Sequence, residues 1–346
     1  MAAGKTYSTN LAVLRIAAMV MVLSIHVGIG TDWPDYVYAG QYGVQLFFIL
    51  SGYLIYASLD SGISAIDFYK KRALRIVPEY WTALILYWLV ETGGYMIDGR
   101  LKEAVGSYDA PYGIRFLRYF TFTNCLIPAE SEGLWNNRNA WWTMSSFMVF
   151  YLLAPLFYKL IRRFFTAMAA LIALMGATPV CRSLLAQLLR RRFDAQTYSL
   201  DSFCEQFPLL HLYCFFLGIT LYLAIREGRQ FFLVLWLLFL LEIYDMRAYR
   251  WECALTLCVM GALQCEIHPG EKIKKAISFL SAGSFSVYCV HSWLMWKFVI
   301  PVFGKVSTHK SVNFALVFVA TSALCYAYYL AYRFGRDRIK RRNNVG

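Results

Sequence analysis

Hydrophobic residues along this chain gather into about ten long blocks separated by polar segments, and a helix needs about 20 mostly apolar residues to cross a bilayer. The blocks are 10–29, 40–58, 78–97, 140–160, 164–180, 207–225, 231–245, 251–265, 279–301 and 312–333. Most of them are long enough to span. The two short blocks between 231 and 265 also fit a tight helical hairpin around Asp245 to Arg250. The pattern predicts an all-α fold, a polytopic membrane bundle of about ten transmembrane helices.

Composition supports a membrane protein. The chain is 59% hydrophobic and only 16% charged, whereas soluble domains carry about 25% charged residues. Its net charge of +13 would suggest nucleic-acid binding in a soluble protein. In a membrane protein such charge is expected in cytoplasmic loops, so we expect the lipid bilayer as a partner and no nucleic acid.

The distribution of Lys and Arg predicts an orientation with both termini in the cytoplasm. The short loops agree with it, although Arg182 and Arg190 to Arg192 argue the other way. Residues 181–206 then fit an interfacial helix, 98–139 an outer loop, and 334–346 a basic cytoplasmic tail. The first block has no small-residue cleavage site and is expected to be a retained helix rather than a signal peptide. We expect residues 1–346 to form a single integral membrane domain.

The cysteines and histidines give no sign of a metal site. The nine cysteines lie mostly in apolar blocks without a CxxC pair, and the five histidines are not clustered. The cysteines are therefore expected to act as small apolar fillers, and no metal is expected.

The first block carries two polar residues that a membrane helix rarely tolerates, Arg15 and His26. They are eleven residues apart, so a helix places both on one face, roughly 16 Å apart along its axis. Ionisable groups in a span usually face the bundle interior or a wet cavity. Two interpretations stay open: a functional pair, or an arginine that reaches the interface and a histidine bonded to a backbone carbonyl.

Three further segments combine polar and apolar residues in the same way. In GVQLFFILSGYLIY (43–56), the Ser51-Gly52 pair favours close helix packing. In FYKKRALRIVPEYW (68–81), Arg72 and Arg75 share a helical face, and Pro78 is expected to open the next span. That arginine pair suits either of two roles: positive charge that ends a membrane span at the cytoplasmic side, or the binding of a phosphate group by the two guanidinium groups. In GSFSVYCVHSWLM (283–295), Tyr288 and His291 share a face as acid/base groups or as a hydrogen-bonded core pair.

Taken together, these motifs resemble the acyltransferase 3 family of integral membrane acyltransferases, over nearly the whole chain. The N-terminal third carries the most specific motifs, R-x10-H, F-F-x-x-S-G-Y and K-R-x-x-R-I-x-P-x-Y-W, and the later matches are looser. The matching residues are Arg15, His26, Phe47, Phe48, Ser51, Gly52, Tyr53, Arg72, Arg75, Ile76, Pro78, Tyr80, Trp81, Trp142, Tyr151, Pro155, Phe216, Gly218, Tyr288 and His291.

One position departs from the family. Many members read W-x-L-x-x-E-x-x-F-Y in the fourth helix, where this chain reads WWTMSSFMVFY and has Phe147 in place of the acid. The departure puts any role of that carboxylate in doubt and suggests a different acceptor subgroup. We expect no esterase-like domain after the membrane part, in which case a second transfer step would need a partner.

The resemblance implies a membrane O-acyltransferase in the bacterial cytoplasmic membrane. It would move an acyl group, taken here as acetyl, from cytoplasmic acetyl-CoA to an envelope glycan, a lipid-linked sugar or a small hydroxyl or amine acceptor. Arg72 and Arg75 would hold the phosphates of the acyl-CoA. Histidine as a residue type has its ordinary pKa near neutral pH, which suits His26 to the role of general base, and an acyl relay through His26 is the open alternative. Arg15 would stabilise the thioester end or an anionic intermediate.

Other features of the chain keep alternatives open. Ser51 is expected to line a tunnel for the acyl group between the helices. It is not expected to act as a nucleophile, because no basic residue follows it at a spacing that would bring the two side chains together. Trp135, Trp141 and Trp142 suit a sugar surface or an interfacial aromatic belt. The alternative function is a transporter or flippase for a polar envelope precursor, which would also hold Arg and His at mid-membrane. A sensor or scaffold that binds anionic lipid through Arg72 and Arg75 is the third possibility.

Overall fold

The computed structural model describes residues 3–99, 114–126, 140–192, 197–242, 249–265 and 267–343, which form helices without a strand among them. Seven of the described helical segments are long and apolar enough to cross a bilayer. They are Thr9–Gly30, Asp35–Asp60, Trp142–Leu160, Phe164–Arg192, Pro208–Arg226, Glu271–Phe303 and Lys310–Ile339. The predicted all-α membrane bundle is thereby confirmed, while the count of about ten spans and the orientation stay predictions.

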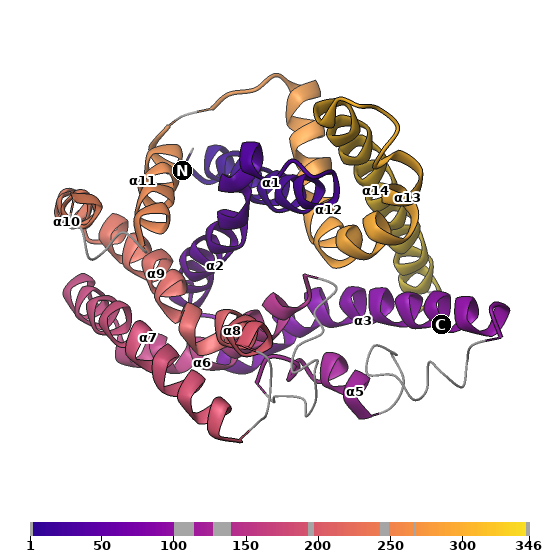
Figure 1. The fold of residues 1–346 in the computed structure, drawn as a ribbon. Helices are drawn as coiled ribbons and strands as arrows, with labels where there is room; N and C mark the ends of the chain where they lie inside the picture. The colour runs from indigo at the N-terminus through magenta and orange to yellow at the C-terminus, as the bar shows by residue number, and fades with distance from the viewer. Residues whose placement is uncertain are drawn as a thin grey trace. The chain divides into compact units, whose positions relative to one another are not determined.

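The chain divides into two compact units, and the first joins its two ends, Met1–Phe47 and Leu257–Gly346. Its elements are α1 (Ala3–Gly30), η1 (Asp35–Tyr42), the start of α2 (Gly43–Asp60), the end of α11 (Arg250–Gln264), α12 (Glu271–Leu294), the π-helical η4 (Met295–Val299), α13 (Ile300–Phe303) and α14 (Lys310–Asn343). Helix α1 packs against both α12 and α14 (Figure 1). Leu23 and Val27 of α1 form a buried cluster with Met295, Val299 and Val317.

The second unit is Phe48–Thr256. Its elements are the rest of α2, α3 (Ala65–Ile97), α5 (Ile114–Phe120), α6 (Trp142–Leu160), α7 (Phe164–Arg192), α8 (Thr197–Gln206), η2 (Pro208–His211), α9 (Leu212–Arg226), α10 (Gln230–Glu242) and the first turns of α11. Helix α9 is the centre of this unit, because nearly all of its residues are buried and α7 packs along it.

Two glycines let α2 and α9 approach closely within the second unit. A Cβ atom added to Gly218 would collide with the carbonyl oxygen of Ile49 and would lie 2.7 Å from the backbone nitrogen of Tyr53. A Cβ atom added to Gly52 would collide in turn with the carbonyl oxygen of Phe215. The predicted close packing at this motif is confirmed for Gly52, since small residues allow backbones in a membrane to touch.

Two helix boundaries differ from the prediction. Helix α3 begins at Ala65, where the Ser64 side chain accepts a hydrogen bond from the Asp67 backbone, so Pro78 lies inside the helix instead of opening it. Helix α7 runs unbroken through Pro179 to Arg192, and only 197–206 forms a separate helix. Proline is tolerated inside membrane helices because neighbouring groups satisfy the freed backbone atoms, so neither proline ends its helix.

Most of the predicted outer loop lies outside the part of the chain that the structure describes, namely residues 100–113 and 127–139 with Trp135. Of the predicted basic tail, residues 334–343 continue α14 as a helix. The turn expected between α10 and α11 falls largely on 243–248, which is also outside the described ranges. The assignment of 1–346 to a single functional domain stays a prediction.

A carboxylate at the end of α2 joins three helices of the second unit. Asp60 accepts hydrogen bonds from the hydroxyls of Tyr158 (2.8 Å) and Tyr222 (2.6 Å), and from the guanidinium of Arg226 (3.0 Å). These partners lie on α6 and α9. A carboxylate that accepts three charged or hydroxyl donors in a partly buried place is costly to remove, because the donors lose their partner.

We expect Asp60→Ala to lower the free energy of unfolding by about 1–3 kcal/mol, the range for orphaned hydrogen-bonding groups. The measurement is the thermal midpoint of the purified protein in a neutral detergent. Asp35→Ala is the matched control, because Asp35 is exposed and accepts no hydrogen bond from another described residue. Equal midpoints for the two variants would contradict a clamping role of Asp60.

Candidate functional site

Two histidines from opposite ends of the chain meet in the first unit. His26 lies in the last turns of α1, and His291 lies near the end of α12. Their ring centroids are 4.9 Å apart, and the ring planes cross at 78°. The contact follows from the packing of α1 on α12. The sequence predicted each histidine as a candidate, and the structure brings the two together.

Backbone hydrogen bonds fix which nitrogen of each ring is free. The Nδ1 of His26 lies 2.7 Å from the carbonyl oxygen of Val22. The Nδ1 of His291 lies 3.0 Å from the carbonyl oxygens of both Val287 and Tyr288. A carbonyl oxygen can only accept, so each Nδ1 carries the hydrogen, and in the neutral ring each Nε2 is then left with a lone pair.

The two free nitrogens differ in their access. The Nε2 of His291 is buried without a hydrogen-bond partner, in a residue only 1% exposed. His26 is partly exposed, and its Nε2 makes no hydrogen bond with any part of the described chain. An unpaired nitrogen on a partly exposed ring is available to accept a proton from a bound molecule, so His26 is the better placed of the two bases.

The surroundings of the histidine pair come from three elements of the first unit. The buried ring of Tyr288 lies 5.9 Å from His291 and 6.1 Å from Phe47, between centroids. Helix α12 then passes into the π-helical segment Met295–Val299, a feature often found at functional sites. Because α1 is one continuous helix, Arg15 lies three turns before His26 on the same face, as predicted, and is partly buried.

The predicted arginine pair lies on α3, in the second unit. The Arg72 guanidinium is half-buried and lies 5.3 Å from the centroid of Phe68 and 5.5 Å from that of Tyr151. Burial lowers the pKa of Arg72, Tyr151 raises it and the charge of Arg75 lowers it, but an arginine stays charged in any case. No carboxylate in the described ranges pairs with Arg72 or with the exposed Arg75, so both charges are free to meet an anion.

The position of the missing acid is filled by aromatic packing. Phe147 of α6 lies 5.1 Å from Phe48 and stacks at 6.1 Å on Tyr151, the same tyrosine that contacts Arg72. A carboxylate here would face aromatic rings, and phenylalanine fits them.

Ser51 of α2 is half-buried, and no part of the described chain hydrogen-bonds to its hydroxyl. Ser51, Arg72 and Arg75 belong to the second unit and are described with it.

Sequence reasoning missed a third histidine. His211 donates from Nε2 to the carbonyl oxygen of Glu205 at 2.7 Å, and its ring lies 5.2 Å from Trp142 and 5.6 Å from Phe48. It stands at the start of α9, where no helical spacing ties it to another motif.

Within the described ranges, no group of three or more His, Cys, Asp or Glu is arranged to hold a metal ion, and the expectation of no metal stays a prediction.

These features define a class of protein, a polytopic helical membrane protein in which the rings of His26 and His291 form a paired-imidazole site. A family model described as an acyltransferase domain, of the acyltransferase 3 type, matches residues 9–330. The chain therefore belongs to this family, which confirms the predicted resemblance.

Two curated proteins are similar to parts of the chain. Nodulation protein 10 of Rhizobium leguminosarum bv. viciae is 28% identical over 184 residues, which is 48% of each chain. The exopolysaccharide production protein ExoZ of Rhizobium meliloti (strain 1021) is 29% identical over 116 residues, 32% of each chain. The chain thus spans about half and about a third of the lengths of these relatives. No solved structure matches it.

Proposed function

We propose that this protein transfers an acetyl group from cytoplasmic acetyl-CoA to a hydroxyl group of an envelope glycan or a related acceptor, in the bacterial cytoplasmic membrane. The observation that carries the proposal is the free Nε2 of His26 beside His291. Family membership supports the acyl transfer. The name of one relative, an exopolysaccharide production protein, favours a saccharide acceptor.

His26 acts in this proposal as the general base. Its Nε2 takes the proton of the acceptor hydroxyl while the oxygen attacks the carbonyl carbon of the thioester. The new C–O bond forms, the C–S bond breaks, and the proton on His26 passes to the leaving sulfur as CoA departs. The bond from Nδ1 to Val22 holds the ring in the tautomer that this step needs, and general bases of this kind contribute about 10²–10⁴-fold.

A covalent route uses the same nitrogen. The Nε2 of His26 attacks the thioester carbon, the C–S bond breaks and CoA leaves as the thiolate, so the acetyl group is carried on an imidazolium that keeps its Nδ1 proton. The acceptor hydroxyl then attacks this acetyl group, the C–N bond breaks, and the hydroxyl proton goes to the CoA thiolate. The two routes differ in one observable. Only the covalent route releases one equivalent of CoA and leaves an acetylated protein when acceptor is absent.

The other candidate residues have supporting roles. Arg72 and Arg75, whose charges meet no carboxylate in the described chain, bind phosphates of the acyl-CoA, since guanidinium groups match phosphate with several donors. Arg15, about 16 Å before His26 along α1, binds a negatively charged part of the donor away from the reacting carbonyl. His291 packs against the His26 ring and Tyr288 packs against His291, so the two support the imidazole of His26, and Ser51 lines the path of the acyl group.

The arginine pair gives the test of the donor. We expect Arg72→Ala/Arg75→Ala to raise the KM for acetyl-CoA by about 100-fold or more, because two charge-assisted contacts of about 1.5 kcal/mol or more each are lost. The measurement is CoA release at varied acetyl-CoA in lipid vesicles with an envelope extract. Lys70→Ala/Lys71→Ala is the control, since it removes the same amount of charge from adjacent, exposed positions of the same helix. Equal KM values for the two double variants would refute phosphate binding by the arginines.

A further inference from the structure

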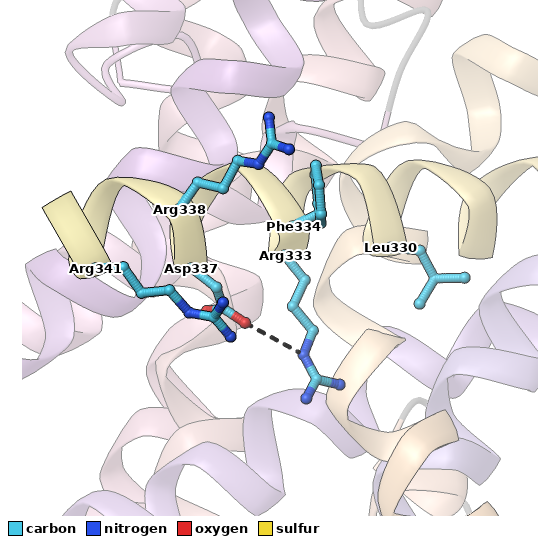
Figure 2. A pocket seen from close by; sticks show the side chains of 6 residues that line it. All are labelled: Leu330, Arg333, Phe334, Asp337, Arg338 and Arg341. Atoms are coloured by element: carbon cyan, nitrogen blue, oxygen red, sulfur yellow. Dashed lines mark ion pairs between the residues drawn. The ribbon is translucent and has the colours of Figure 1, made fainter.

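The C-terminal end of α14 carries a surface hollow that the proposed chemistry does not use. The hollow has a volume of about 600 Å³ and is lined by Leu330, Arg333, Phe334, Asp337, Arg338 and Arg341 (Figure 2). Sites that hold small molecules usually have volumes of about 300–1,000 Å³. Leu330 and Phe334 lie toward the start of the hollow, with Arg333 between them, and Arg338 and Arg341 lie toward its end, so the later end carries more charge.

The length of α14 places this hollow at the membrane surface. The helix has 34 residues, about 51 Å at 1.5 Å per residue, whereas the hydrocarbon core is about 30 Å thick. Its last turns carry six cations and one acid, which hydrocarbon does not accept. These residues are Arg333, Arg336, Asp337, Arg338, Lys340, Arg341 and Arg342. The apolar part of α14 therefore crosses the bilayer, and its charged end lies among the headgroups.

The charges of the hollow do not cancel. Asp337 is shared between Arg333 at 3.8 Å and Arg336 at 3.4 Å. The Arg338 guanidinium lies over the Phe334 ring, 4.4 Å from its centroid, instead of on a carboxylate. Arg341 makes no ion pair with any described residue, and Figure 2 shows it on the same side of the helix as Arg333 and Asp337. At least two guanidinium groups are thus available for an anion.

We propose that this hollow binds an anionic phospholipid, with its negative headgroup attracted by the cations Arg338 and Arg341, which point to opposite sides of the helix (Figure 2), and an acyl chain lying along Leu330 and Phe334. Arg338 and Arg341 follow Leu330 and Phe334 along the helix, as a headgroup follows the acyl chain in a lipid. Leu330 and Phe334 are 49% and 60% exposed, so both are open to a lipid chain. The proposal stands on the first unit alone and does not depend on the acyltransferase activity.

The experiment uses the full chain, purified in a neutral detergent and titrated with phosphatidylglycerol or phosphatidylcholine of the same acyl chains. Native mass spectrometry reports how much lipid stays bound. We expect tighter binding of phosphatidylglycerol, and about 25-fold weaker binding in Arg338→Gln/Arg341→Gln, since each surface cation contributes about 1 kcal/mol. Asp337→Asn should act in the opposite direction and tighten binding, because it removes the one nearby negative charge.

Two controls make the result specific. Arg190→Gln/Arg191→Gln removes two exposed cations from the end of α7 and should leave phosphatidylglycerol binding unchanged. Thermal midpoints in phosphatidylcholine should be equal for all variants, which shows that each is folded. The proposal fails if both lipids bind equally, or if the α14 and α7 variants weaken binding alike. Displacement of the lipid by millimolar glycerol 3-phosphate would assign the hollow to a soluble phosphate ligand instead and would also overturn the proposal.

Discussion

Replacing His26 by alanine is expected to lower kcat for acetyl transfer by about 10²–10⁴-fold, the usual contribution of a general base. The KM for acetyl-CoA should stay within about twofold of wild type, because the phosphates are held elsewhere, and equal losses in kcat and kcat/KM identify an interaction made in the transition state. The physical reason is the single free nitrogen: Nδ1 of His26 is tied to Val22, so removal of the ring leaves no other proton acceptor on that turn of α1.

The measurement is the initial rate of CoA release at saturating acetyl-CoA and acceptor, with purified protein in lipid vesicles. His309→Ala is the control, because His309 is exposed and lies outside the paired-imidazole site. His291→Ala should lose less activity than His26→Ala, since its Nε2 is buried. A His26→Ala protein that keeps more than a tenth of the wild-type rate would remove His26 from the chemistry.

The second large effect is on folding. We expect Gly218→Ala to lower the free energy of unfolding by about 1–3 kcal/mol or more, as overpacking does, and to reduce the yield of folded protein. The added methyl group would collide with the carbonyl oxygen of Ile49 and lie 2.7 Å from the nitrogen of Tyr53. These are backbone atoms of α2, so no side chain can turn away, and the whole helix must shift.

The thermal midpoint and the monodisperse yield in neutral detergent measure this effect. Gly176→Ala is the matched control: Gly176 also lies inside a helix, but an added Cβ there meets nothing within 4 Å. Alanine favours a helix over glycine by about 1 kcal/mol, so this control should be as stable as wild type or more so. If Gly218→Ala also keeps the wild-type midpoint, the close approach of α2 and α9 does not limit stability.

The sequence located the helices well because apolar length is a strong signal. Each of the ten predicted blocks corresponds to a helix in the described ranges, including α10 and α11, whose short blocks were the weakest signals. The helix ends were harder. Pro78 resembled a helix start, but the polar turn before it, from Ala65 onward, extends the same helix, because a serine cap and a surface location let charged residues join it.

The candidate site was predictable in its residues but not in its contacts. Spacing along one helix placed Arg15 with His26 and Tyr288 with His291, since helical periodicity acts over a few turns. Nothing local indicated that the rings of His26 and His291 lie 4.9 Å apart, because that contact depends on which helices pack together. The network around Asp60 was missed for the same reason, as its partners lie on α6 and α9.

The replacement of the family's acid by Phe147 fits the second unit as it is built. Phe147 supports Tyr151, and Tyr151 contacts Arg72. The side chain at this position therefore bears on how Arg72 is held, and a carboxylate there would add a negative charge near it. The aromatic residue leaves the Arg72 charge to an external anion, which agrees with the role proposed for it.

The measurement that tests the central claim most directly follows radiolabelled acetyl-CoA incubated with vesicles that contain the protein and an envelope extract. Wild type should release CoA and transfer label to a saccharide fraction of the extract in equal amounts, and the His26→Ala protein should do neither. Release of CoA without acceptor, together with label on the wild-type protein, would select the covalent route. Folded wild type that releases no CoA with any acceptor extract would contradict acetyl transfer from acetyl-CoA.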